Sequence, residues 1–597
     1  MRLNWKNYNQ KKSFYNNPGV KAMLKGYRLI IRQFMTSNLI KTSILFLGLL
    51  FPINSAFAED CHDLILFNAT IIDGSGSPPF KGDLAVKGER ISALGDLAEQ
   101  CAKARKDVNG KVLTPGFINM LSWATESLII DGRALSDIHQ GVTLEVMGEG
   151  WSMGPLNDTM KKDMIARQNI AKYPITWTTL DEYLQFLENK GIAVNVASFV
   201  GATTIRMHEL GEADKAPNTE ELERMKVLMR QAMEDGALGL GSSLIYAPAF
   251  YAKTEELIEL AKVAGEYGGM YISHMRSEGN QIEAAVEELI RISKEAKLPA
   301  EIYHLKFAGK QNWHKFDKII AMIDKARSEG HRITTDMYSY TAGATGLDAA
   351  MPPWVQEGGL ESWTNRLKDP AIRPKIIAAM KENSNDWENL YYYAGADKVI
   401  LNEFKNPELR IHTGKTLSQL AKELGKSPEE TAIDLVIEDN SRVGAIYFLM
   451  SEENVKRQMK LPYMSFGSDG EAPAPEAPFL SSNPHPRAYG NVAKLLGKYV
   501  REEKVISLEE AVKKLTSLPA SNLGIKKRGS LAVGNFADLV LFDPETIADK
   551  ATFSKPHQLS VGVSDVWVNG KQALKDAKST EVMAGQVVRG PGYKAKE

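Results

Sequence analysis

The sequence predicts an α/β fold: a (β/α)8 barrel with a small composite β-sandwich domain built from both ends of the chain. Two observations support this prediction. Short apolar runs that end in a polar residue recur about every 30 residues with a helical pattern between them, which is the period of a βα unit and indicates a parallel sheet. Segments of short strands and turns flank this repeat near both ends of the chain.

The repeat is clearest between residues 270 and 337, where three successive strand-like runs end in His274, His304 and Asp336. The functional residues of a (β/α)8 barrel lie at the C-terminal ends of its strands, so these side chains are expected to converge. Two histidines at neighbouring strand ends can bind one metal ion. A lone histidine is more often a satisfied core residue, but two at equivalent positions favour the metal-ligand interpretation.

Eight strands are expected to close the barrel, at residues 117–120, 143–147, 195–200, 238–241, 270–273, 300–303, 332–335 and 464–467. The gap before the last strand is too long for one βα unit, which predicts a mostly helical insertion at about residues 344–460. Insertions at this face of a barrel often form a lid. The predicted domains are the first part of the β-sandwich at 59–115, the barrel with its insertion at 116–520, and the second part of the β-sandwich with the C-terminal tail at 521–597.

Residues 1–58 have the pattern of a cleavable signal peptide. A basic start is followed by a short apolar run at residues 44–51 and by Ala56-Phe57-Ala58. We therefore expect a periplasmic protein, cleaved near Ala58/Glu59 and without a stable membrane anchor afterwards. A start at Met35 gives a more typical signal length than a start at Met1.

The overall composition is that of a globular protein. Charged residues make up 25% of the chain and the formal net charge is −1, which gives no indication of nucleic-acid binding. The two cysteines, Cys61 and Cys101, follow the signal peptide closely. In an exported protein they can form one disulfide, or they can remain two unpaired thiols. Neither has the neighbours expected of a nucleophile or a metal ligand.

Carboxylates stand at two further predicted strand ends. Asp469 follows the eighth strand, where it can bind metal or act as a general base, or simply form a turn with Gly470. Glu149 lies between two glycines after the second strand. It either completes a His-His-Glu zinc site with an open position for water, or is a surface residue in a glycine turn.

Several motifs resemble the N-acyl-D-amino-acid deacylases (D-aminoacylases) of the amidohydrolase superfamily, over most of residues 63–575. They include LTPGFIN, QGVTLEVMGEG, ISHMRSEG, EIYHLKFAGKQNW, FGSDG, NPHPRAYGNVAKLLG and GSLAVGNFADLVLFDP. The resemblance implies a metal-dependent hydrolase barrel with a tightly held zinc ion. It implies His274 and His304 as ligands, Glu149 where the family usually has Cys, and Asp469 as the group that moves the proton.

The resemblance also implies a small-molecule substrate, an N-acyl-D-amino acid, hydrolysed at its amide bond to a carboxylate and a D-amino acid. Lys306, Tyr338 and Arg487 correspond to the residues that hold the substrate carboxylate. The runner-up in the same superfamily is hydrolysis of a cyclic amide or a small dipeptide, as in dihydroorotase-like enzymes. The oligomeric state has no signature in the sequence.

The chain departs from the superfamily at the first strand, where an H-x-H motif is usual. This chain has Leu121-Ser122-Trp123 there, and neither Leu121 nor Trp123 can ligate a metal. One tightly bound Zn²⁺ ion is therefore expected. The same departure is compatible with a third hypothesis, a catalytically impaired barrel that binds a ligand.

Overall fold

The computed structural model describes residues 61–595. The predicted signal peptide and the junction at Ala58/Glu59 lie outside these residues. Cys61 and Cys101 form a disulfide, which decides between the two alternatives for these cysteines. Within residues 61–595, no helix combines the length and the apolar character that a membrane span requires.

The barrel strands pair in parallel in two runs, β6-β7-β8 and β9-β10-β11-β12-β13-β17. All eight predicted strands are present, with β8 and β9 together in place of the third. Their bounds are β6 Phe117–Asn119, β7 Val142–Met147, β8 Asn195–Ser198, β9 Val200–Gly201, β10 Gly239–Ser243, β11 Met270–His274, β12 Ala300–Ile302, β13 Ile333–Met337 and β17 Met464–Phe466.

Backbone hydrogen bonds join these two runs into a closed barrel. The Leu238 N–H donates to the Ser198 carbonyl at 2.9 Å, beside the junction of β8 and β9. On the other side, the Met120 N–H donates to the Phe466 carbonyl at 3.1 Å, next to β6 and β17. The predicted (β/α)8 barrel is thereby confirmed.

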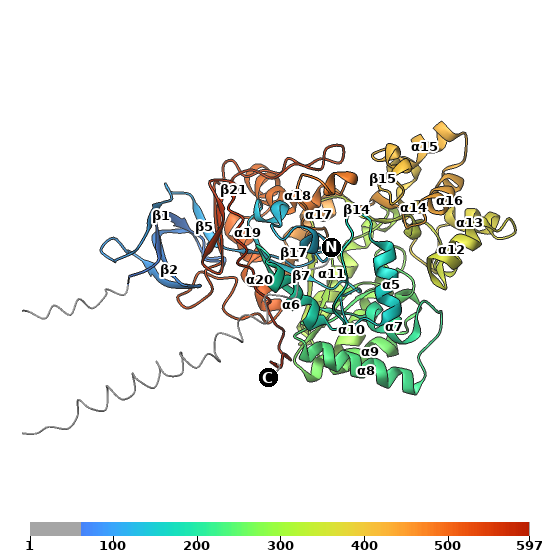
Figure 1. Ribbon diagram of the computed structural model, residues 1–597, viewed down its shortest axis with the longest axis horizontal. Coiled ribbons are helices and arrows are strands. Elements are labelled where there is room, and N and C mark those ends of the chain that lie inside the picture. The colour runs from blue at the N-terminus through green and yellow to red at the C-terminus, as the bar shows by residue number, and fades with distance from the viewer. Residues whose placement is uncertain (1–60, 596–597) are drawn as a thin grey trace, which may run out of the picture. The chain divides into compact units, whose positions relative to one another are not determined.

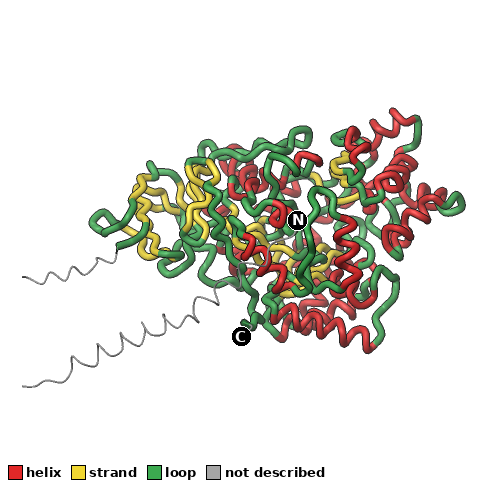
Figure 2. Tube along the Cα trace, viewed as in Figure 1, coloured by secondary structure: helices red, strands yellow, loops and turns green. Residues whose placement is uncertain are grey.

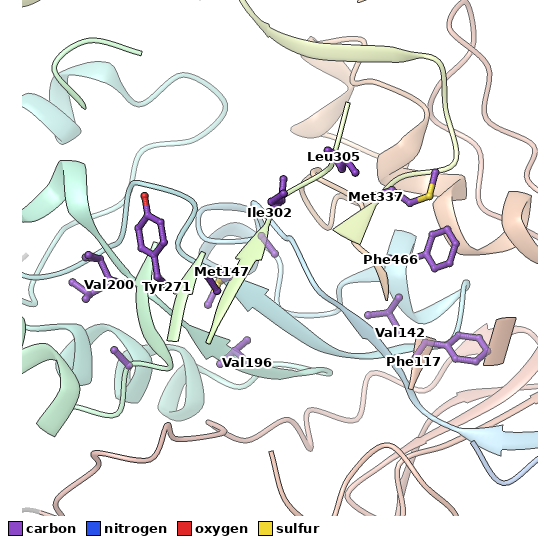
Figure 3. Close-up of a cluster of buried hydrophobic side chains, with 14 of the residues drawn as sticks. Phe117, Val142, Met147, Val196, Val200, Tyr271, Ile302, Leu305, Met337 and Phe466 are labelled. Carbon is purple, nitrogen blue, oxygen red and sulfur yellow. The ribbon is translucent and has the colours of Figure 1, made fainter. Parts of the chain in front are cut away.

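Helices surround the strands, and the strand side chains that face them form the largest apolar core (Figure 3). The connecting helices are α3 Ser127–Ile130, α4 Leu135–Ile138, α5 Asp158–Arg167, α6 Leu180–Lys190, α7 Ala202–Leu210, α8 Thr219–Glu234, α9 Thr254–Glu266, α10 Ile282–Ala296 and α11 Phe316–Ser328. After β17 come α18 Arg487–Lys494, a π-helical segment Leu495–Glu502, α19 Leu508–Leu515 and α20 Ser517–Asn522. Successive side chains of a strand alternate between the side that faces the helices and the side that faces the barrel interior. Ile118, Leu144 and Val146 are among the residues that fill the interior.

The two β segments form one nine-stranded sheet, as the blue and red strands of Figure 1 show. Its strands are β1 Leu64–Ile71, β2 Phe80–Lys87, β3 Arg90–Gly95, β4 Arg105–Asp107, β5 Val112–Pro115, β18 Leu539–Phe542, β19 Val563–Val568, β20 Lys571–Lys575 and β21 Lys578–Ser579. Antiparallel pairing of β5 with β18 joins the two ends of the chain. This confirms the composite β domain.

The insertion between β13 and β17 contains both helices and a small sheet (Figure 2). The helices are α12 Gly359–Lys368, α13 Arg373–Met380, α14 Leu390–Ala394, α15 Leu417–Leu424, α16 Pro428–Asp439 and α17 Glu452–Met459. The strands β14 Ala342–Gly346, β15 Val399–Glu403 and β16 Gly444–Phe448 pair antiparallel. The sequence predicted the helices but not this sheet. Strand-forming residues are present in β15 (VILNE) and β16 (GAIYF), but β14 reads AGATG, with Thr345 as its one β-branched residue and no aromatic.

Candidate metal centre and active site

Glu149, His274 and His304 meet at the C-terminal ends of β7, β11 and β12. Glu149 Oε1 lies 3.0 Å from His274 Nδ1 and 2.9 Å from His304 Nε2. The two imidazole rings are nearly perpendicular, with centroids 4.5 Å apart. All three side chains are buried. The structure therefore brings the three predicted metal ligands into one cluster.

The local backbone explains how these side chains reach one point. Gly148 and Gly150 on either side of Glu149 have φ values of 106° and 66°. A Cβ atom at Gly148 would lie only 2.4 Å from the Phe199 carbonyl oxygen, so glycine alone fits there. His304 has an unusual φ of 32°, and its N–H donates to Asp336 Oδ1 at 2.9 Å. Strained backbone of this kind clusters at functional sites.

The cluster has the chemistry of a zinc site. The three ligand atoms lie within 4.8 Å of one another, and two imidazoles with one carboxylate are a standard catalytic zinc set. His274 Nε2 is buried and makes no hydrogen bond within residues 61–595. Burial alone would raise the pKa of Glu149, but the two histidines hold that pKa well below its usual value. The residues present therefore fit a metal ion.

Glu278 belongs to the same site, although the sequence pattern predicted no role for it. Its Oε1 lies 3.0 Å from His304 Nδ1, and its Oε2 lies 3.6 Å from His274 Nε2. Burial and Lys306 oppose a positive charge on His304, but Glu278 and Glu149 outweigh them and raise the pKa of His304 to about 10. The one signal for Glu278 in the sequence was its position in HMRSEG, four residues after His274. That spacing places it near His274 but gives no information about its contact with His304.

The ammonium group of Lys306 is paired with the carboxylate of Glu278. Lys306 Nζ donates to Glu278 Oε1 at 2.8 Å and to Oε2 at 3.0 Å, and lies 2.6 Å from His304 Nδ1. Burial opposes the charge on Lys306, but Glu278 raises its pKa above the usual value. Lys306 is thus a buried cation beside the predicted metal ligands.

Asp469 and Arg487 form an ion pair beside this cluster, in which Arg487 is buried and Asp469 is mostly buried. Asp469 follows β17 and Arg487 begins α18, and Arg487 Nη1 lies 2.9 Å from Asp469 Oδ2. The Asp469 backbone has a left-handed φ of 49°, and its N–H donates to the Leu121 carbonyl at 2.9 Å. Burial raises the pKa of Asp469, while Arg487 opposes that rise.

Tyr338 lies between the two cations. Its ring centroid is 5.5 Å from Lys306 Nζ and 4.6 Å from Arg487 Cζ. The Tyr338 hydroxyl is buried and has no hydrogen-bond partner in the described part of the chain. Burial raises the pKa of Tyr338 to about 12, so the phenol is neutral and can donate a hydrogen bond. The three predicted substrate-binding residues are therefore neighbours.

Comparison with known proteins identifies the family of the chain. Residues 106–573 match the model of the amidohydrolase family. The chain is 34% identical over 531 residues to a D-aminoacylase of Alcaligenes xylosoxydans xylosoxydans, covering 88% of this chain and 97% of the relative.

Two solved structures are similar over their whole length. One is a D-aminoacylase studied for its binuclear metal centre, with one-metal activation and second-metal attenuation; its TM-score is 0.74 at 32% identity, covering 88% of this chain and 100% of that one. The other is the N-acyl-D-glutamate deacylase of Bordetella bronchiseptica, complexed with zinc and a phosphonate inhibitor that mimics the tetrahedral intermediate. Its TM-score is 0.73 at 30% identity, covering 89% of this chain and 100% of that one.

Proposed function

Because the chain belongs to the amidohydrolase family, as a metal-dependent hydrolase of C–N bonds outside peptides, we propose that it deacylates N-acyl-D-amino acids. The single observation that carries this proposal is the buried set of Glu149, His274 and His304 beside the Asp469–Arg487 ion pair. It combines a metal-binding cluster, a carboxylate that can move a proton, and cations for the substrate carboxylate. Relatives that act on N-acyl-D-amino acids support the substrate class.

Glu149, His274 and His304 would hold one tightly bound zinc ion. When bound, such an ion polarises the scissile carbonyl and makes water a better nucleophile near neutral pH. The count of one is our proposal and rests on Leu121 and Trp123, which offer no lone pair to a second ion.

Asp469 is proposed to transfer the proton. Its carboxylate accepts a proton from the water that attacks the carbonyl carbon, and delivers it to the leaving nitrogen as the C–N bond breaks. The products are a carboxylate and a D-amino acid. Because burial raises the pKa of Asp469, its ionised form is a stronger base than an exposed aspartate.

Lys306, Tyr338 and Arg487 are proposed to bind the substrate carboxylate. The neutral Tyr338 hydroxyl can donate one hydrogen bond, and the guanidinium of Arg487 can bind a carboxylate through two. Lys306 and Arg487 are each already paired with a carboxylate of the protein, which fixes their positions before substrate arrives. Positioned groups of this kind lower the barrier by orienting the reacting atoms.

The test is hydrolysis by the zinc-loaded chain starting at Glu59. We expect release of the amine from N-acetyl-D-amino acids, with the L-enantiomers and cyclic amides hydrolysed far more slowly. Metal content measured on the same preparation separates the alternatives. Zinc-loaded protein that hydrolyses none of these substrates would favour the impaired barrel, and preferential turnover of cyclic amides would favour the dihydroorotase-like activity.

We also propose that the chain is exported to the periplasm. The signal-like residues 1–58 and the disulfide between Cys61 and Cys101 support this, because disulfides persist in oxidising compartments. N-terminal sequencing of the protein from a periplasmic fraction should find a start near Glu59. Soluble cytoplasmic protein that retains residues 1–58 would contradict it.

A further inference from the structure

The indole of Trp123 contacts Glu149 on the side away from the two histidines. Trp123 Nε1 donates a hydrogen bond to Glu149 Oε2 at 2.8 Å. The other oxygen, Oε1, is the one that faces His274 and His304, at 3.0 and 2.9 Å. The two oxygens of this carboxylate therefore have separate partners: one faces the metal cluster and the other is held by the indole.

Trp123 is held in this position by the closure of the barrel. Its backbone N–H donates to the Gly470 carbonyl at 2.9 Å, and the preceding residue Ser122 forms a parallel bridge with Gly470. The Leu121 carbonyl accepts from the Asp469 N–H at 2.9 Å, and the Leu121 side chain is fully buried in the barrel interior. The indole therefore approaches Glu149 from a backbone segment that is fixed against the end of β17.

The chemistry of the indole gives this contact two consequences. The indole nitrogen can only donate a hydrogen bond. An imidazole nitrogen at this position would have a lone pair and could bind a second cation together with Oε2. A hydrogen bond to the free oxygen of a metal-binding carboxylate also fixes its orientation, and loss of such a partner typically weakens metal binding about 10–100-fold.

We propose that Trp123 is a positioning residue that fixes Glu149 as a one-oxygen ligand and closes the site to a second metal ion. This rests on the proposed function only in taking Glu149, His274 and His304 as the metal site. The proposal gives Trp123, which stands at the first strand where the superfamily usually has a histidine, a role of its own. Trp123 cannot ligate a metal, but it orients Glu149, which can.

The experiment compares zinc binding by metal-free wild type, Trp123→Phe and Trp123→His. Phe keeps an aromatic ring but removes the N–H, and His restores a lone pair. Trp313→Phe is the matched control, because Trp313 is also half-buried and its indole donates to the Leu449 carbonyl at 2.9 Å, away from Glu149. Zinc affinity is measured by competition with a chelator, and stoichiometry by elemental analysis after gel filtration.

We expect one zinc ion per chain for wild type, and zinc binding weakened about 10–100-fold in Trp123→Phe but unchanged in Trp313→Phe. Trp123→His should retain zinc beyond one equivalent. Two tightly held zinc ions in wild type, wild-type affinity in Trp123→Phe, or no additional zinc in Trp123→His would each overturn the proposal. The count for wild type needs no variant, so two tightly held zinc ions there would overturn the proposal even if a substitution prevents folding.

These measurements require no substrate, so they can fail separately from the proposed function. A chain that binds one zinc ion with the expected dependence on Trp123, yet hydrolyses no N-acyl-D-amino acid, keeps this inference and rejects the function. A chain that hydrolyses these substrates while Trp123→Phe binds zinc normally keeps the function and rejects the inference.

Discussion

Glu145 lies within β7 and Glu149 just after it, and both carboxyl groups are buried, with exposed fractions of 0% and 4%. Glu149 faces two histidines and an indole N–H. Glu145 Oε2 accepts from Asn119 Nδ2 at 2.8 Å, while Glu145 Oε1 and Asp137 Oδ1 each lack a donor within residues 61–595. The two carboxyl groups of Glu145 and Asp137 interact directly.

These neighbours give the two glutamates different charge states at neutral pH. Burial raises the pKa of Glu145 to about 7, while the histidines hold the pKa of Glu149 well below its usual value. Burial also raises the pKa of Asp137, and the charge of Glu145 adds to this. Glu145 and Glu149 are both buried, so the neighbouring groups determine whether each carboxyl keeps its proton. Glu149 is an anion suited to a metal, whereas burial favours the protonated form of Glu145.

The largest expected effect separates these two glutamates directly. Glu149→Gln should lose zinc more than 100-fold, because even the loss of a hydrogen-bond partner of a ligand costs about 10–100-fold. Deacylation should fall with the zinc. Glu145→Gln is the matched control on the same strand and should retain zinc and activity. Full zinc content in Glu149→Gln would show that this carboxylate is not a ligand.

Asp469 extends the comparison, because its pKa is raised by burial as for Glu145 but it has a cation beside it. Asp469→Asn should retain zinc and lose about 10²–10⁴-fold in kcat, as for removal of a general base. In wild type, activity requires the ionised carboxylate, so it should rise with pH through the pKa of Asp469, above the usual value for aspartate. Parallel loss of metal and turnover in Asp469→Asn would instead identify a ligand.

Substitution of Glu278 tests whether a carboxylate that contacts the two histidines affects zinc affinity without being one of the three proposed ligands. Glu278→Gln should weaken zinc binding about 10–100-fold, because it removes the anion that faces His304 Nδ1. Glu283→Gln is the control, since Glu283 lies nearby on α10 but pairs with Lys318 near the surface. Equal zinc affinity of the two variants, measured by chelator competition, would leave Glu278 without this role.

The sequence predicted the barrel, the composite β domain and the family, because each depends on local pattern. Strand ends recur with the βα period, so the pattern alone places His274, His304 and Asp469 at one face of the barrel. Similarity to amidohydrolases over residues 106–573 confirms the family that the motifs indicated. The roles of the individual residues stay predictions that the variants above test.

What the sequence could not predict depends on contacts between distant segments. Trp123 could be excluded as a ligand from its chemistry, but its hydrogen bond to Glu149 arises only when β6 and β7 lie side by side. Glu278 faces both histidines because β11 and β12 are neighbours. The sheet of the insertion was missed for a different reason: β14 is made of Ala, Gly and Thr, and its pairing with β16 decides its conformation.

The smallest expected effect concerns the proton at Glu145. A carboxyl with a pKa near 4.5 in the unfolded chain and about 7 in the folded protein stabilises the fold fully below pH 4.5, relative to higher pH. That contribution is lost as pH rises through about 7, and a shift of this size corresponds to about 3 kcal/mol. Glutamine has the same shape and no proton to lose.

Glu145→Gln should therefore have nearly the same urea midpoint as wild type at pH 5, and a higher midpoint at pH 8. Both proteins are compared without metal, since zinc binding itself depends on pH. Buried groups that do not contact Glu145 titrate equally in both and cancel in the difference between variant and wild type. Asp137 does not cancel: burial raises its pKa in both proteins, but the charge of Glu145 raises it further in wild type only, which adds to the difference in the same direction. A difference in midpoint that does not change between pH 5 and pH 8 would mean that Glu145 is ionised in the folded protein, and that the contrast with Glu149 is not one of charge.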